Sequence, residues 1–129
     1  MTTPQATLFL QRLHDSVSDV YSLAHLDTWI EKKTYLDGRK FSFKNHEFQR
    51  TVIQDACETS IVVKCAQIGL SEILARWTLA ACATQNDFTV IYTFPTTNDA
   101  EKFCKTRIDP CVEASPELSR SINPQLNNS

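Results

Sequence analysis

The feature that most constrains the fold is an apolar run followed by a small-residue loop and a helix-forming segment, all within residues 59–83. The run Ile61-Val62-Val63 is β-branched and apolar, as in a buried strand. Gly69 closes the loop, and a helix is expected over 71–83. Strand, tight loop and helix is the layout of a phosphate-binding P-loop, in which the loop amides and the helix N-terminus face an anion.

The loop matches the usual P-loop pattern only in part. The pattern G-x-x-x-x-G-K-[ST] places Gly69 as the second glycine and Ser71 as the terminal hydroxyl. Lys64 then stands at the first-glycine position, and Leu70 at the usual lysine position. Because a P-loop wraps around the phosphates, a flexible lysine can deliver its ammonium from either end. The pattern alone leaves an alternative equally open, a buried strand that turns into a helix at Gly69.

Composition indicates one modest core and a reducing compartment. A chain of 129 residues with 42% hydrophobic content can bury one core. The net charge of -2 provides no global attraction to nucleic acid or to an anionic membrane, and no apolar run reaches transmembrane length. The five scattered cysteines form no C-x-x-C pair and the three histidines have no ligand spacing, which favours free thiols in the cytoplasm over a metal site.

Helical and turn signals precede the loop. Apolar residues at helical spacing predict an amphipathic helix over 5–26, followed by a short helix over 29–33 that Asp27 or Thr28 caps. Residues 31–50 are locally basic with interleaved aromatic residues, which suits phosphate contacts or base stacking as well as a solvated face with aromatic anchors. Within this region, Asp37-Gly38 indicates a turn.

Two further helices and a second strand complete the pattern. A helix over 46–57, capped by Asn45, carries Gln49, which is either a surface residue or a contact to adenine, since an amide both donates and accepts. Its inner face is expected to hold Phe48, Val52, Ile53 and Ala56. Residues 88–94 read as a second buried strand, and a helix capped by Thr96 or Asn98 follows until Pro110 or Pro116.

Alternation of strand and helix predicts an α/β fold with a parallel sheet and flanking helices, preceded by the N-terminal amphipathic helix. Two strands are few for a parallel sheet, so the chain is expected to open a longer domain. The predicted division is an N-terminal helical segment over 1–36, an incomplete P-loop core over 37–118 and a polar tail or linker over 119–129.

Three segments together resemble one family, the large terminase subunit of tailed bacteriophages, the ATPase-nuclease that packages DNA. Residues 64–71 resemble the variant P-loop of its lambda-type branch, residues 43–49 its adenine-contacting segment, and residues 92–103 the strand-Pro-Thr-helix segment that follows. The resemblance covers roughly residues 40 to 115. It implies binding of ATP with Mg²⁺ by Gln49, Lys64, Cys65, Ala66, Gln67, Ile68, Gly69, Leu70 and Ser71.

The same resemblance assigns roles within this set. Lys64 would contact the phosphates, the residues after it would form the cradle, Ser71 would offer its hydroxyl to Mg²⁺, and Gln49 would contact adenine. Gln67 stands where relatives often carry an arginine, so the role of that arginine is in doubt here.

Other parts of the family pattern are missing. No apolar run ending in two acids follows Phe94, and the nuclease carboxylates are absent, so no catalytic residue is expected within this chain. The chain is therefore interpreted as a fragment, or as a truncated prophage remnant, in the host cytoplasm and without membrane contact. Implied partners are double-stranded DNA through the full-length parent, the rest of the ATPase domain, and neighbouring motor subunits or the small terminase subunit.

Two alternatives remain at this stage. The chain is also compatible with the start of a helicase-like translocase, although helicases normally keep G-K-[ST] in the loop. The second alternative is a non-enzymatic α/β interaction module, in which Lys64 is a surface residue and the loop holds no nucleotide.

Overall fold

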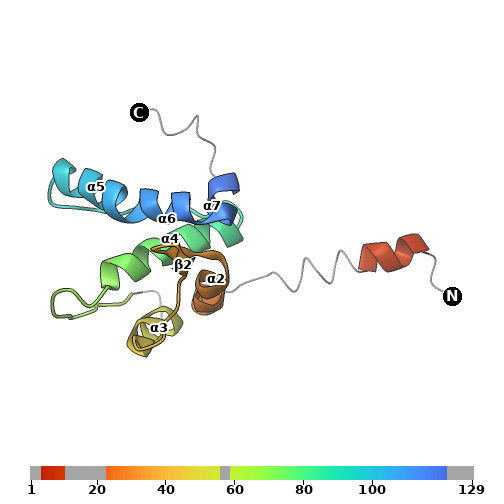
Figure 1. Cartoon of the computed structure of the whole chain (residues 1–129), viewed down its shortest axis with the longest axis horizontal. Helices are drawn as coiled ribbons and strands as arrows, with labels where there is room; N and C mark the ends of the chain where they lie inside the picture. The colour runs from red at the N-terminus through yellow and green to blue at the C-terminus, as the bar shows by residue number, and fades with distance from the viewer. Residues whose placement is uncertain (1–3, 11–22, 56–58, 122–129) are drawn as a thin grey trace.

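The computed structural model describes residues 4–10, 23–55 and 59–121, and its body consists mainly of helices arranged around one long helix, α4 (Figure 1). The elements of the body are η1(Leu23–His25), α2(Leu26–Lys33), β1(Tyr35–Leu36), β2(Arg39–Lys40), α3(Glu47–Gln54), α4(Leu70–Thr84), α5(Thr97–Phe103), η2(Cys104–Ile108), α6(Asp109–Ala114) and α7(Pro116–Ser121). Residues 4–10 form a further helix, and most of the amphipathic helix predicted over 5–26 lies outside the described residues. Within the described residues, no helix has the length and apolarity to cross a membrane.

Helix α4 is the centre of the core, as its apolar composition predicts. It begins one residue before and ends one residue after the helix expected over 71–83. Its residues Ile73, Ala80 and Ala81 are buried, whereas Leu74 is 37% exposed. Helices α2, α3 and α7 all contact α4. The core around it is formed by Leu26, Trp29, Ile30, Phe41, Phe43, Ile53, Leu70, Ile73, Leu79, Ala80, Ala81, Cys111 and Leu118.

The predicted turn at Asp37-Gly38 is confirmed as the turn of a short hairpin. Strands β1 and β2 pair antiparallel, with Tyr35 opposite Lys40. Both turn residues have positive φ, 50° at Asp37 and 75° at Gly38, as in the two-residue turns that match the twist of a hairpin. The hairpin follows α2 directly, so it presents Arg39 and Lys40 at the surface beside that helix.

The predicted parallel sheet is not formed in this structure. Neither 61–63 nor 88–94 belongs to a sheet among the described residues, where the one sheet is the two-stranded hairpin. Ile61, Val63 and Ile91 are 88%, 94% and 82% exposed. A strand requires a neighbouring strand to accept its backbone hydrogen bonds, and the described residues supply no neighbour to either segment. The fold is thus a mixed α and β structure in which helices predominate.

Two predicted helix starts are wrong. Helix α2 begins at Leu26, before both proposed caps, and Asp27 lies in its first turn, buried, with its Oδ2 atom 3.3 Å from Nε of Arg50. Helix α3 begins at Glu47 after His46, whose side chain makes no cap hydrogen bond, while Asn45 adopts a positive φ of 68°. Asp27 pairs with Arg50 instead of capping α2, and the left-handed backbone of Asn45 keeps it from capping α3.

The orientation of α3 also differs from the prediction. Gln49 and Ile53 are its buried residues, whereas Phe48 is 46% exposed. Two main-chain amides donate to the Glu47 carboxylate at the start of this helix, those of Glu47 and Asn45, and they hold the pKa of Glu47 below its usual value.

The C-terminal helices follow the prediction more closely. Thr96 caps α5, since its hydroxyl oxygen accepts a hydrogen bond from the amide of Asp99 at 3.2 Å. Pro110 does not interrupt the helical path, because η2 continues with helical backbone through Ile108 and Asp109 into α6, and Pro110 lies among the first residues of α6. The path ends at Ala114, before Ser115, which precedes Pro116 and is extended.

A buried arginine of α4, Arg76, contacts both the hairpin and α6. The side chain of Arg76 is 1% exposed, and its Nη2 atom donates to Glu72 at 2.7 Å and to the carbonyl of Tyr35 at 3.1 Å. Its Nη1 atom contacts the sulfur of Cys111 at 3.3 Å, and its guanidinium lies 4.5 Å from the ring centre of Phe41. Burial raises the pKa of the Cys111 thiol, which therefore stays protonated beside the arginine.

We expect Arg76→Met to destabilise the chain by about 3 kcal/mol, because the change removes one partner of a buried ion pair and leaves the Tyr35 carbonyl unsatisfied. Lys105→Met is the control, since Lys105 belongs to an exposed pair with Glu101 and its loss costs less than about 0.5 kcal/mol. Urea unfolding of both variants measures the difference. Equal midpoints would show that Arg76 does not hold the hairpin.

Candidate functional site

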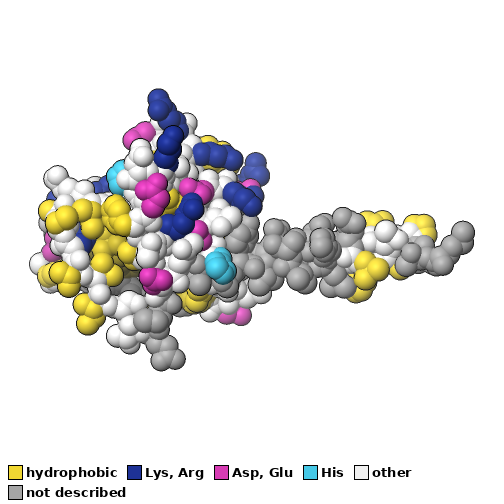
Figure 2. Space-filling view, turned by 90° about the horizontal axis from the view of Figure 1, so that it is seen from below, with side chains coloured by type: hydrophobic (Ala, Val, Ile, Leu, Met, Phe, Trp, Pro, Cys, Tyr) yellow, Lys and Arg dark blue, Asp and Glu magenta, His cyan; other side chains and the backbone are white. Residues whose placement is uncertain are grey.

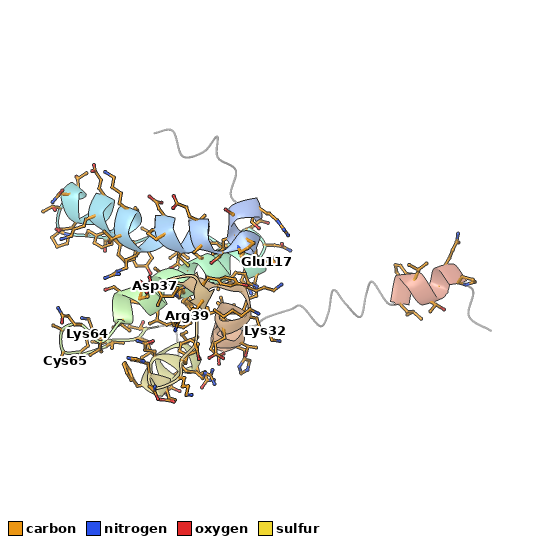
Figure 3. The ribbon with its side chains drawn as sticks, in the orientation of Figure 1. Lys32, Asp37, Arg39, Lys64, Cys65 and Glu117 are labelled. Atoms are coloured by element: carbon orange, nitrogen blue, oxygen red, sulfur yellow. The ribbon has the colours of Figure 1, made fainter. Side chains whose placement is uncertain are left out.

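The candidate loop lies between the apolar run 61–63 and α4. Two of its residues, close together in the chain, have left-handed backbone conformations. Gln67 has a φ of 59° and Gly69 a φ of 76°, and α4 begins at the next residue, Leu70. Residues 64–67 are exposed and Ile68 is half-buried. Lys64 and Cys65 lie at the outer end of the loop, at the edge of the body (Figure 3).

Hydrogen-bond donors in this loop are available. The Lys64 ammonium donates to the carbonyl of the next residue, Cys65, at 3.3 Å. Among the residues that the structure describes, the main-chain amides of Cys65, Ala66, Gln67 and Gly69 have no protein acceptor, whereas the amide of Ile68 closes the turn at residues 66–67. A bend with several free amides beside a lysine is suited to hold an anion.

Leu70 and Ser71 have different environments at the start of α4. Leu70 is 7% exposed and belongs to the core, so the position that normally carries the P-loop lysine faces inward here. A lysine at that position would place its ammonium in the apolar core, which is unfavourable. Ser71 is exposed in the first turn of the helix. Lys64 is therefore the cation that the loop itself can offer to a ligand.

Gln49 from α3 fixes the end of the loop. Its side chain is 6% exposed, and Nε2 donates to the carbonyl of Ile68 at 2.8 Å. A Cβ atom at Gly69 would lie 2.6 Å from the same Nε2 atom, so the amide packs against the bare glycine. The interpretation of Gln49 as a surface residue is wrong, and the structure brings it together with the loop as the prediction of a shared site requires.

Two hollows flank this junction of α3, loop and α4. One has a volume of about 680 Å³, and Gln49, Gly69, Glu72 and the hairpin residues Arg39 and Lys40 are among the residues that line it. The other has a volume of about 760 Å³ and a mainly apolar lining from α3, residues 59–62 and α4. The first is the polar, charged one, and we call it the hairpin pocket. Among the described residues, no group of three His, Cys, Asp or Glu side chains is arranged to hold a metal ion.

A comparison with protein families identifies the family of this chain. A family model described as phage terminase large subunit gpA, ATPase domain, matches residues 44–129, more than half of the chain. The chain belongs to this terminase family. The match covers the loop, Gln49 and all of α4 to α7. Searches of curated proteins and of solved structures gave no significant match.

Sequence reasoning missed an ionic cluster beside the candidate loop, formed by Glu72, Arg76 and Arg107. Glu72 accepts hydrogen bonds from Arg76 and, at 3.4 Å, from Nη1 of Arg107. The spacing of four residues between Glu72 and Arg76 is a helical ion-pair signal that the sequence contains. Nothing local indicates Arg107, because it lies 35 positions from Glu72 in the chain.

We expect Gly69→Ala to destabilise the terminase chain more than Gly38→Ala. Both glycines have nearly the same positive φ, 76° and 75°, so both changes carry the left-handed strain of about 1 kcal/mol. Only at Gly69 would the new methyl group also displace Gln49 from Ile68, which adds about 1 kcal/mol for the lost hydrogen bond.

Urea unfolding of the two variants, alone and in a Gln49→Ala background, measures this contrast. The extra cost at Gly69 should shrink when Gln49 is absent, because the clash is then gone. An extra cost that is unchanged in that background would rule out the packing of Gln49 against Gly69 as its cause.

Proposed function

We propose that this chain is the ATP-binding segment of a terminase DNA-packaging motor, with the nucleotide phosphates held by residues 64–71. The observation that carries the proposal is the Lys64 ammonium beside a loop in which the amides of Cys65, Ala66, Gln67 and Gly69 have no acceptor among the described residues. The burial of Leu70 supports it, since the usual lysine position is then unavailable to a ligand.

The proposed position of the base is the hairpin pocket, beside Gln49. One N–H of the Gln49 amide is used on Ile68, and its second N–H and its Oε1 atom have no partner among the described residues. Adenine recognition by an amide requires one donor and one acceptor of this kind. The hairpin pocket gives a ligand access to this otherwise buried residue.

The proposed Mg²⁺ contact is the hydroxyl of Ser71, with the remaining ligands from ATP and from an acid outside this chain. We propose that 61–63 and 88–94 become strands of a parallel sheet when a strand carrying that acid is present, because both segments have the composition of buried strands. The ATPase core would then include 37–118, with binding by this chain alone weak and without sustained hydrolysis.

We expect Lys64→Ala to weaken binding of Mg·ATPγS by about tenfold, the loss that one charge-assisted phosphate contact would cause. Lys32→Ala is the matched control, because Lys32 is an exposed lysine on the far side of the body from the loop (Figure 3). Isothermal titration of wild type and both variants measures the affinities. Equal binding by wild type and Lys64→Ala, or no binding by wild type, would contradict the proposal.

A second part of the proposal concerns DNA and the remaining motor. Figure 2 shows Lys and Arg side chains gathered along one edge of the body. The basic segment over 31–50 gives a separate hypothesis, that Lys32, Lys33, Arg39 and Lys40 touch DNA or an adjacent subunit. Of these four, Lys32, Arg39 and Lys40 are exposed. Lys33 is the exception, since its ammonium pairs with Glu117 at 2.9 Å. We propose that these three side chains contact DNA phosphates in the host cytoplasm, with other motor subunits completing the channel.

Replacing Lys32, Arg39 and Lys40 by glutamine should make the negative slope of log affinity against log salt shallower by about three for duplex DNA, one per lost phosphate contact. The control replaces Lys102, Lys105 and Arg120, three exposed cations on α5, η2 and α7, which changes net charge equally. Fluorescence anisotropy at several salt concentrations measures both slopes. Identical slopes would place the DNA contact elsewhere.

A further inference from the structure

Glu72 stands between the candidate loop and two arginines. It follows Ser71 in the first turn of α4 and is among the residues that line the hairpin pocket with Gln49 and Gly69. One of its oxygens is 2.7 Å from Nη2 of Arg76, and the other is 3.4 Å from Nη1 of Arg107.

The two arginines differ in their freedom to move. Arg76 is buried and held by Tyr35, Phe41 and Cys111 in addition to Glu72. Arg107 has a side chain that is 47% exposed, and the contact to Glu72 is the one ion pair that the structure gives it. If Arg107 turned away, Arg76 would still neutralise Glu72. Release of Arg107 therefore leaves no buried charge without a partner.

Arg107 also comes from a distinctive segment, the π-helical turn η2. Such turns occur mostly as single interruptions in longer helices and frequently at functional sites. The turn lies between α5 and α6 and packs against α4, so Arg107 is placed beside the first turn of α4.

The electrostatics of the region favour an anion. Lys64 is the one charged residue between Thr59 and Ser71, whereas a nucleoside triphosphate carries several negative charges. The hairpin pocket beside the loop is lined by three cationic side chains, Arg39, Lys40 and Lys44, and by two acids, Asp37 and Glu72. Glu72, which lines this pocket, pairs with both Arg76 and Arg107, so the three side chains together carry one excess positive charge.

We propose that Arg107 is a phosphate-binding residue, which exchanges its long contact with Glu72 for a phosphate of the nucleotide held at the Gln49–Gly69 junction. The inference rests on the proposed function, because it requires a nucleotide at this site. A guanidinium can offer two parallel N–H groups to phosphate oxygens, a stronger contact than the single 3.4 Å approach to Glu72. Glu72 holds Arg107 near the site when no nucleotide is bound.

The test compares Arg107→Gln with Lys105→Gln by titration of Mg·ATPγS and of adenosine. Lys105 lies on the same turn and is 73% exposed, so its variant removes the same charge without removing the proposed contact. Arg107→Gln should weaken Mg·ATPγS binding about tenfold and Lys105→Gln less than twofold, with adenosine binding unchanged in both. Both variants should keep the melting temperature of wild type, because both ion pairs are exposed.

The outcomes separate this inference from the function on which it rests. Wild-type affinity in Arg107→Gln together with reduced affinity in Lys64→Ala would overturn the role of Arg107 and leave the nucleotide site intact. Equal losses in Arg107→Gln and Lys105→Gln would reduce the effect to net charge and also overturn it. Absence of binding by wild type would overturn both proposals.

Discussion

The burial of Arg76 is the constraint on which the arrangement of the helices depends. A guanidinium that is 1% exposed is tolerated only where its charge is paired, and among the described residues both Nη atoms of Arg76 have partners while its Nε atom has none. Here the partners come from four places in the chain: Glu72 in the same helix, the hairpin carbonyl of Tyr35, the ring of Phe41 and the thiol of Cys111. The hairpin and α6 are therefore fixed against α4 by one side chain.

That constraint extends to the terminase loop, because the loop leads directly into α4. Leu70 enters the core at the first residue of the helix, and Gln49 holds the preceding carbonyl of Ile68. The helical body thus positions the end of the loop at Gly69, while the segment before it, from Ile61 to Lys64, is exposed. The loop therefore has one end anchored to the helical body, at Gly69, and one exposed end.

Local interactions explain which predictions were confirmed. The helix at α4, the turn at Asp37-Gly38 and the cap at Thr96 depend on residues within a few positions of one another. The predicted strands depend on neighbours far along the chain, and their apolar residues are exposed where the described residues provide none. The family match over 44–129 agrees with the prediction drawn from the loop and its two flanking segments.

By itself the sequence determined the helix after the loop, the glycine at the bend and the terminase resemblance, because each depends on residue types at short spacing. Only the tertiary structure decided that Gln49 is buried against Gly69, that Leu70 faces the core, and that Arg107 meets Glu72. The hydrogen bond from Gln49 to Ile68 spans 19 positions and that from Arg107 to Glu72 spans 35. At such separations no local preference specifies which side chains meet in the folded chain.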